Sequence, residues 1–254
     1  MNGKILAPVR VNNPVNLLDN AYFEVAQAGR NGLHGSRKYV CDRWISWNAD
    51  AAFNSGFITP ASPIDQRIIP DKIDTTQTYT VGIGLADGRI IVNSGKFPTG
   101  AGLFATVWFG ERDGISFVRV GENQNVCWVA LYPGAYTADT FPTPVPRLNS
   151  TELLECQRYF YSFKTGSGSF NGYYSSSTVA RVMFNLPVKM RTTPTVFADL
   201  ALGNIFPENI VPKELRGAYM TGNMLVCELG VTGGTVRNLI CWKPNCDISF
   251  VSDL

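Results

Sequence analysis

Histidine is almost missing from this sequence, and its scarcity narrows the chemistry that the chain can support. The only histidine among the 254 residues is His34, which lies in the segment GLHGS. Common tetrahedral zinc sites combine histidine with closely spaced cysteines, whereas Cys241 and Cys246 have four residues between them. We therefore expect no metal site and no cofactor, and we read the cysteines as small buried hydrophobes. A Ser-His-Asp triad would have to use His34.

Strong charge of one sign and long apolar runs are also absent. The formal net charge is +2, which gives no general argument for nucleic acid or an anionic membrane as a partner. A basic segment near the start lies beside aromatic residues, but the rest of the chain does not extend it, and a solvated loop explains it: Arg30, Arg37, Lys38 and Arg43. No apolar run approaches membrane-spanning length, and the start lacks the apolar core of a signal peptide. We expect a soluble product without membrane insertion.

What the sequence does contain is short strands joined by turns. Apolar residues make up 45% of the chain, and 24 glycines and 15 prolines are scattered through it without a fixed-period repeat. The segment TYTVGIGL alternates apolar and small residues, which predicts a half-buried strand, and ADG then turns the chain into RIIVN, so 78–93 should form a hairpin. The segment NVCWVALY (125–132) is apolar on both faces and predicts a central strand.

A proline-rich connector separates two groups of such strands. Residues 133–148 include the segment PTPVP, which predicts a stiff extended crossing. Asn149 with Glu152 three residues later resembles a capping box, and this helix should be the only substantial one. Further on, the glycine pair at 233–234 predicts a tight hairpin.

These patterns predict an all-β fold of two β-sandwich, jelly-roll-like domains joined by the connector and one short helix. We expect an extended arm over 1–15, a first sandwich over 16–146 and a second over 147–254 that begins with the helix. Four aromatics after the helix are predicted to pack between the domains: Tyr159, Phe160, Tyr161 and Phe163.

Five motifs in order resemble a family of bacteriophage and prophage tail-fibre or receptor-binding proteins: NLLDNAYF (16–23), YVCDRW (39–44), WVALYPGAYTADTFP (128–142), ELLECQRYF (152–160) and VMFNLPVKMRTTPTV (182–196). The resemblance implies a virion appendage with sandwiches similar to carbohydrate-binding modules. Since the start lacks a signal peptide, we expect it to be made in the cytoplasm of the bacterial host. It also implies a homotrimer that contacts the host surface. We expect residues 1–15 to reach other virion proteins.

Two segments mix aromatic rings with amides and hydroxyls, as sugar binding requires. The first is SFNGYYSSS (169–177), read as a loop in which Tyr173 and Tyr174 are exposed beside Phe170 and Asn171. The second is DRWISWN (42–48), in which Trp44 is predicted to lie in the core and Trp47 to contact ligand.

We expect a non-enzymatic protein that attaches phage to a bacterial surface, through glycan. The first alternative is a purely structural virion protein, such as a head-fibre, baseplate or tail component. The second is a surface-polysaccharide depolymerase, which would need paired carboxylates from among Asp42, Asp50, Asp65, Asp71 and Asp74. Acidic residues in the loops of β-proteins usually shape turns, which favours the non-enzymatic reading.

Overall fold

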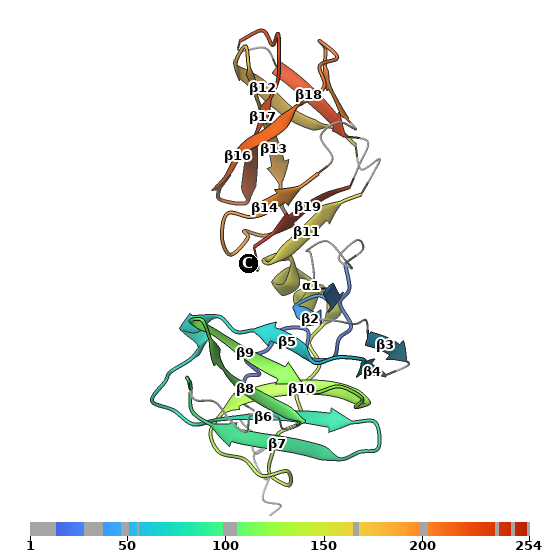
Figure 1. Cartoon of the computed structure of the whole chain (residues 1–254), viewed down its shortest axis with the longest axis vertical. Coiled ribbons are helices and arrows are strands. Elements are labelled where there is room, and N and C mark those ends of the chain that lie inside the picture. Colours follow the sequence, from blue (N-terminus) through green and yellow to red (C-terminus); the bar gives the residue numbers. More distant parts are fainter. Residues whose placement is uncertain are drawn as a thin grey trace, which may run out of the picture. The chain divides into compact units, whose positions relative to one another are not determined.

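The computed structural model confirms the all-β architecture, with four antiparallel sheets consistent with two β-sandwich domains (Figure 1). It describes residues 14–27, 38–46, 51–54, 56–98, 106–164, 168–198, 203–236, 239–244 and 247–252. The chain divides into two compact units. Unit 1 comprises Met1–Tyr22 and Ala52–Pro146, and unit 2 comprises Phe23–Ala51 and Arg147–Leu254. The segment 23–51, which the sequence-based division places in the first sandwich, lies with the second unit.

Unit 1 contains two layers of strands. One layer has the order β3-β4-β10-β6-β7, and the other contains β5-β9-β8. The bounds are β3 (Ala51–Asn54), β4 (Phe57–Pro60), β5 (Ile64–Arg67), β6 (Tyr79–Leu85), β7 (Ile90–Gly95), β8 (Val107–Arg112), β9 (Ile115–Val120) and β10 (Val126–Pro133). A short 3-10 helix, η1 (Pro70–Lys72), precedes β6. The predicted hairpin is confirmed as β6–β7, and β10 is a central strand between β4 and β6.

Strand β6 is buried along its whole length, so the prediction of a half-buried strand is wrong. The reason lies in its glycines. A Cβ atom on Gly82 would collide with the ring of Phe141, and one on Gly84 would collide with the ring of Trp128. The two aromatic side chains therefore cover this face of the strand at Gly82 and Gly84, where it carries no side chains, and both are buried themselves.

The first part of the connector packs onto this sheet. Phe141 lies parallel to the ring of Trp128 with centroids 6.1 Å apart, and it also contacts Tyr132 and Tyr136. The hydroxyl of Tyr22 donates a hydrogen bond to the carbonyl oxygen of Pro144 at 2.5 Å. These contacts hold the segment 134–144 against the sheet. The buried residues of this small core are Trp128, Ala130, Tyr132 and Phe141.

Unit 2 contains a three-stranded sheet of order β11-β19-β14 and a six-stranded sheet of order β15-β18-β12-β13-β17-β16. The bounds are β11 (Phe160–Phe163), β12 (Phe170–Ser176), β13 (Val179–Asn185), β14 (Thr195–Phe197), β15 (Gly203–Phe206), β16 (Glu214–Thr221), β17 (Met224–Gly230), β18 (Leu239–Pro244) and β19 (Ile248–Val251). Both sheets contribute to a core that contains Tyr174, Phe184, Trp242 and Phe250. The hairpin of β1 (Lys38–Cys41) and β2 (Trp44–Ser46) also belongs to this unit.

The glycine pair at 233–234 does not form the predicted hairpin, because β17 and β18 are not neighbours. Strand β17 pairs with β13 and β16, whereas β18 pairs with β12 and β15. After β17 the chain runs along the β12–β13 turn, where the amide of Val231 donates to the Thr178 carbonyl and that of Gly234 to the Ser177 carbonyl. The glycines carry the chain past other strands before it re-enters the sheet.

The predicted helix is α1 (Asn149–Gln157), the single α-helix among the described residues. It begins one residue earlier than the capping prediction requires. Leu148 is the N-cap residue, no side chain caps the helix, and the Glu152 amide donates to the Leu148 carbonyl at 3.0 Å. Asn149 is therefore the first helical residue, and the prediction that it caps the helix is wrong. None of the described helical segments is long and apolar enough to cross a membrane.

Contacts within unit 2 explain why the early segment belongs there. The Gln27 side chain donates to the Phe160 carbonyl oxygen at 2.9 Å. The guanidinium of Arg43 lies 3.4 Å from the centroid of the Tyr159 ring. A stacked cation and a side chain-to-backbone bond thus join 23–51 to the segment that follows α1.

Candidate functional site

The segment predicted as a sugar-binding loop is a strand, β12, and this changes which of its side chains are accessible. Successive side chains of a strand point to opposite faces of its sheet. Phe170 and Tyr174 lie on the core side. Phe170 contacts Phe163 and Phe184, and Tyr174 is fully buried. Asn171 is exposed and Tyr173 is half-buried on the other face.

Tyr174 contradicts the prediction that both tyrosines are exposed. Its hydroxyl donates to Glu208 Oε2 at 3.3 Å, and burial, followed by the charge of Glu208, raises the pKa of Tyr174 to about 12. Gly234 approaches its ring so closely that a Cβ atom there would collide with it. A ring held in this way is not available to stack on a sugar.

On the outer face of the six-stranded sheet, Tyr173 begins a row of interacting side chains across three strands. Tyr173 of β12 is in register with Arg181 of β13, which is in register with Glu228 of β17. Arg181 donates from Nε to Glu228 Oε1 at 2.9 Å and from Nη1 to the Tyr173 hydroxyl at 3.3 Å. We call these three residues the platform row.

The platform row remains in contact with solvent, and its Arg181 guanidinium stays charged. The side chains of Arg181 and Glu228 are 34% and 28% exposed. Hydrogen bonds with Tyr173 and then with Glu228 raise the pKa of Arg181 above its ordinary value, so the guanidinium stays charged at any physiological pH. Leu239, which is paired with Tyr173 on β18, is 82% exposed and adds an apolar end to the row.

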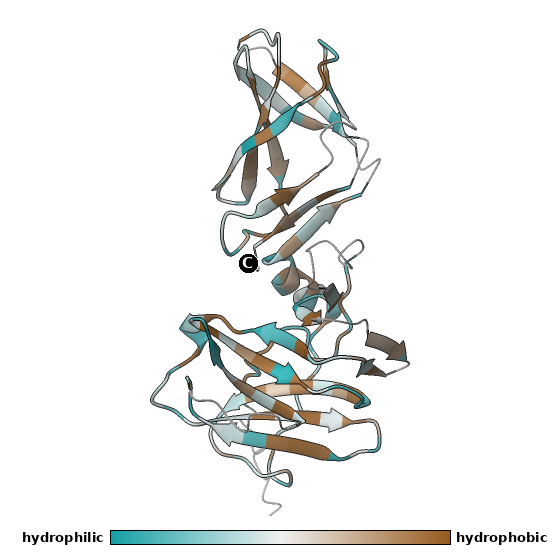
Figure 2. Ribbon diagram, viewed as in Figure 1, coloured by the Kyte–Doolittle hydropathy of each residue, from teal (hydrophilic) through white to brown (hydrophobic). Residues whose placement is uncertain are grey.

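This arrangement supplies the elements of sugar recognition on one open surface. The face of an aromatic ring accepts the C–H face of a sugar, while charged groups hydrogen-bond to its hydroxyls. The platform row offers the Tyr173 ring beside guanidinium donors and a carboxylate acceptor, each held by its neighbour. Figure 2 shows hydrophilic and hydrophobic residues mixed along the strands of this sheet.

Unit 1 contains a similar but more deeply buried row, in which Asp65 of β5, Arg119 of β9 and Trp108 of β8 are in register. Both oxygens of Asp65 accept hydrogen bonds from Arg119, each at 2.5 Å, and the guanidinium lies 5.0 Å from the centroid of the Trp108 ring. The side chains of Arg119 and Asp65 are only 23% and 10% exposed. The order of acid, arginine and aromatic is the same, but these charged groups mainly satisfy one another.

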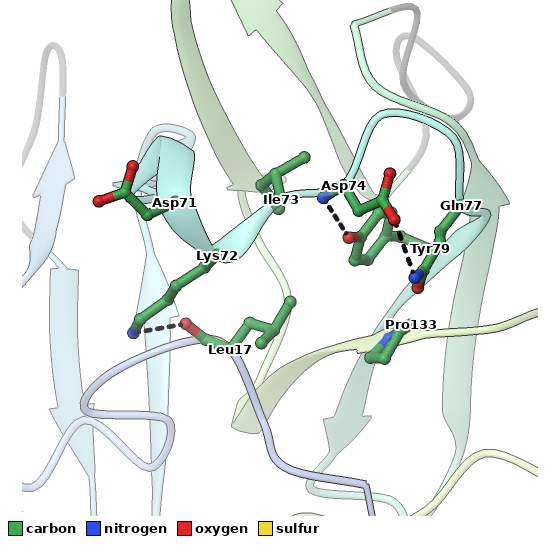
Figure 3. Close-up of a pocket in the computed structure, with 8 residues that line it drawn as sticks. All are labelled: Leu17, Asp71, Lys72, Ile73, Asp74, Gln77, Tyr79 and Pro133. Carbon is green, nitrogen blue, oxygen red and sulfur yellow. Dashed lines mark hydrogen bonds between the residues drawn. The ribbon is translucent and has the colours of Figure 1, made fainter.

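Unit 1 contains a pocket of about 250 Å³ that sequence reasoning did not find (Figure 3). It is lined by Leu17, Asp71, Lys72, Ile73, Asp74, Gln77, Tyr79 and Pro133. These residues come from the segment that precedes β1, from η1, from the turn before β6, from the start of β6 and from the end of β10. Because they are distant in sequence, no local pattern could bring them together.

The turn at Asp74 shapes one wall of the pocket. Asp74 Oδ1 accepts bonds from the amide and hydroxyl of Thr76, and Oδ2 accepts one from the Gln77 side chain at 3.0 Å. The Thr76 hydroxyl and amide, and then Gln77, lower the pKa of Asp74 below its usual range. The Asp74 amide in turn donates to the Tyr79 hydroxyl at 2.7 Å, as Figure 3 shows.

The other sequence-predicted residues are distributed as follows. Trp47, His34 and Asp50 lie outside the described residues, and Trp44 is fully buried, which confirms its core assignment. Of the carboxylates considered for a depolymerase, Asp42 is buried and accepts a bond from Gln27, while Asp71 and Asp74 line the same pocket.

The four aromatics after the helix lie in or against the interior of unit 2. Tyr159 and Phe160 are buried, and Tyr161 and Phe163 pack against the core. Their predicted role between domains stays a prediction. In the described part of the chain, no three potential metal ligands gather, and the cysteines there are free thiols.

Comparison of the chain with protein-family models, with curated proteins and with solved structures finds no match.

Proposed function

We propose that this chain is a phage virion appendage, a fibre or receptor-binding protein that attaches to a bacterial surface by binding glycan without cleaving it. The platform row carries the proposal. It presents a tyrosine ring, a guanidinium and a carboxylate on an open strand surface, with hydrogen bonds that fix each relative to the next. A surface prepared in this way loses little side-chain entropy when it binds.

The order of the five motifs and the two-sandwich architecture support the assignment to a virion. In this proposal the chain forms a homotrimer, and residues 1–15 join it to other virion proteins. Trimeric display would place three weak glycan sites on one particle component, and several weak contacts made together hold far more tightly than one.

The experiment is a glycan array probed with the full chain and with Tyr173→Ala. We expect binding to bacterial surface glycans, weakened about tenfold or more in the variant because the stacking ring is lost, equivalent to about 1.4 kcal/mol. Phe53→Ala is the matched control, since Phe53 is also an exposed aromatic, 52% exposed, but lies on β3 in unit 1. This control should bind like the unaltered protein.

Two other outcomes would replace the proposal. Tight incorporation into particles, shown by antibody labelling in electron microscopy, together with no glycan binding would identify a purely structural virion protein. Release of reducing ends from host polysaccharide, abolished by substituting one aspartate, would identify a depolymerase. Equal loss of binding in Tyr173→Ala and Phe53→Ala would remove the platform row from the proposal.

A further inference from the structure

The pocket of Figure 3 has donors that the protein uses only in part. The ammonium of Lys72 has three N–H groups, and the structure directs bonds at the Leu17 carbonyl oxygen (3.2 Å) and at Asp19 Oδ1 (3.4 Å). The hydroxyl of Tyr79 accepts the Asp74 amide, so its own proton has no assigned acceptor among the described residues. Two donors therefore remain for a ligand.

Other residues of the lining carry acceptors. Asp71 is exposed and makes no hydrogen bond or ion pair with another described residue. An ionised carboxylate has about four acceptor positions, and Asp74 uses three, for Thr76 twice and for Gln77 once. The Gln77 amide donates through its nitrogen, which leaves its carbonyl oxygen as an acceptor. A ligand that both donates and accepts at several neighbouring positions matches this inventory, as adjacent sugar hydroxyls do.

The remaining lining is apolar. Leu17, Ile73 and Pro133 contribute hydrocarbon, and Tyr79, which is 2% exposed, also belongs to the lining. Small-ligand sites in proteins combine such apolar lining with a few fixed polar groups. A pyranose ring presents the complementary pair of surfaces, with C–H groups on one face and hydroxyls at the edge.

Size and charge narrow the ligand further. A volume of about 250 Å³ lies just below the roughly 300 Å³ at which pockets accept drug-sized ligands, so one sugar ring fits better than a longer chain. The lining carries two carboxylates, Asp71 and Asp74, and one ammonium, Lys72. This excess of negative charge opposes uronic acids, sialic acids and phosphate.

We propose that this pocket binds a single neutral sugar residue, the terminal hexose or deoxyhexose of a glycan. The inference rests on the proposed function only for the natural source of the sugar, because the pocket in unit 1 is separate from the platform row in unit 2. The hydrogen bonds that depress the Asp74 pKa keep that carboxylate ionised in mild acid, so binding should change little between about pH 7 and about pH 5.

The test is a titration of the full chain, followed by backbone amide NMR shifts. The probes are methyl glycosides of glucose, galactose, mannose, N-acetylglucosamine, rhamnose and fucose, with glucuronic acid as the anionic comparator. We expect at least one neutral glycoside to bind with a Kd of about 1 mM and to shift amides within 71–79. Glucuronic acid should bind at least about tenfold more weakly.

Variants separate this pocket from the platform row. Asp71→Asn and Gln77→Ala, which alter exposed side chains, should each weaken the neutral glycoside about threefold to tenfold. Asp87→Asn is the matched control, since Asp87 is another exposed turn aspartate in unit 1, bonded to Arg89 and outside the pocket lining. Tyr173→Ala should leave pocket binding unchanged.

Three results would overturn the inference. The first is that none of the six glycosides shifts amides within 71–79. The second is tighter binding of glucuronic acid than of every neutral glycoside. The third is equal weakening by Asp87→Asn and Asp71→Asn. If shifts appear only around Tyr173 and Arg181, the proposed function stands and the pocket inference fails.

Discussion

Gly84 of β6 lies beneath the indole ring of Trp128, with no room for a Cβ atom between them. Gly84→Ala must therefore displace the ring or the strand, and we expect a loss of about 1–3 kcal/mol in unfolding free energy. Urea denaturation checks this value. Gly110→Ala is the control, because the nearest atoms to its Cβ would lie 3.9 Å away. Similar losses in the two variants would contradict the packing described here.

Three buried groups predict how stability depends on pH. Burial raises the pKa of Cys227 to about 12, and it is the main cause that raises the pKa of Tyr132 and of Tyr174 to about 12. The unfolded chain releases these protons near pH 8.5 for cysteine and near pH 10 for tyrosine, whereas the folded chain keeps them. Above about pH 9 the folded state therefore binds more protons, and stability must fall as pH rises.

Unfolding free energies measured by urea denaturation from about pH 8 to about pH 11 test this dependence. We expect a decline that begins near pH 9 and steepens above pH 10, approaching about 1.4 kcal/mol per pH unit for each group fully ionised in the unfolded chain. Cys227→Ala lowers stability overall and should reduce the first part of the decline, to which Cys127, whose pKa is also raised by burial, contributes as well. A stability that stays constant to pH 11 would show that these groups ionise equally in both states.

At this scale the sequence predicted side chains well only where the local pattern was sufficient. The small polar neighbours of Tyr173 and Tyr174 suggested two exposed rings, but a strand must place them on opposite faces. Tyr174 is covered in part by Gly234, 60 positions away, which no local reading reveals. The pocket at Asp74 was missed for the same reason, since Leu17 and Pro133 reach it from distant segments.

Between neighbouring strands, the row of Asp65, Arg119 and Trp108 couples β5, β9 and β8. Asp65→Asn removes one charge of a largely buried, doubly hydrogen-bonded pair, and we expect a loss of about 2–4 kcal/mol in unfolding free energy. The control is Asp87→Asn: Asp87 and its partner Arg89 are both exposed, so its loss of unfolding free energy should be much smaller. Thermal and urea unfolding of both variants would show whether burial makes the difference.

Elements whose signals are local were predicted correctly. The β6–β7 hairpin follows from alternation around a turn, and β10 follows from apolar residues on both faces. The glycine pair at 233–234 is also a local turn signal, but the hairpin predicted from it is wrong. A turn at glycine can direct the chain to a distant strand as well as back along the preceding one. Strand order in a sheet depends on contacts between distant segments, so the six-stranded order of unit 2 was not readable from the sequence.

At the scale of the whole molecule, unit 2 is built from two segments that are distant in sequence, and this leads to a testable prediction. The segment 23–51 supplies the Arg43 guanidinium that covers Tyr159 and the Gln27 amide that bonds to Phe160. A fragment of residues 147–254 should therefore melt at a lower temperature, with less cooperativity, than one in which 23–51 is joined to it by a flexible linker. Calorimetry distinguishes the two fragments, and identical melting would mean that 23–51 adds nothing to the fold.

The interleaved order of the two units also determines when each unit can complete its fold during translation. Ribosomes deliver the chain from its N-terminus, and domains generally fold as they emerge. Unit 1 has all its strands once Pro146 is made, yet the loop of 23–51 that interrupts it must wait for Arg147–Leu254. A product that stops before residue 159 would leave the Arg43 guanidinium without the Tyr159 ring and the Gln27 amide without the Phe160 carbonyl oxygen.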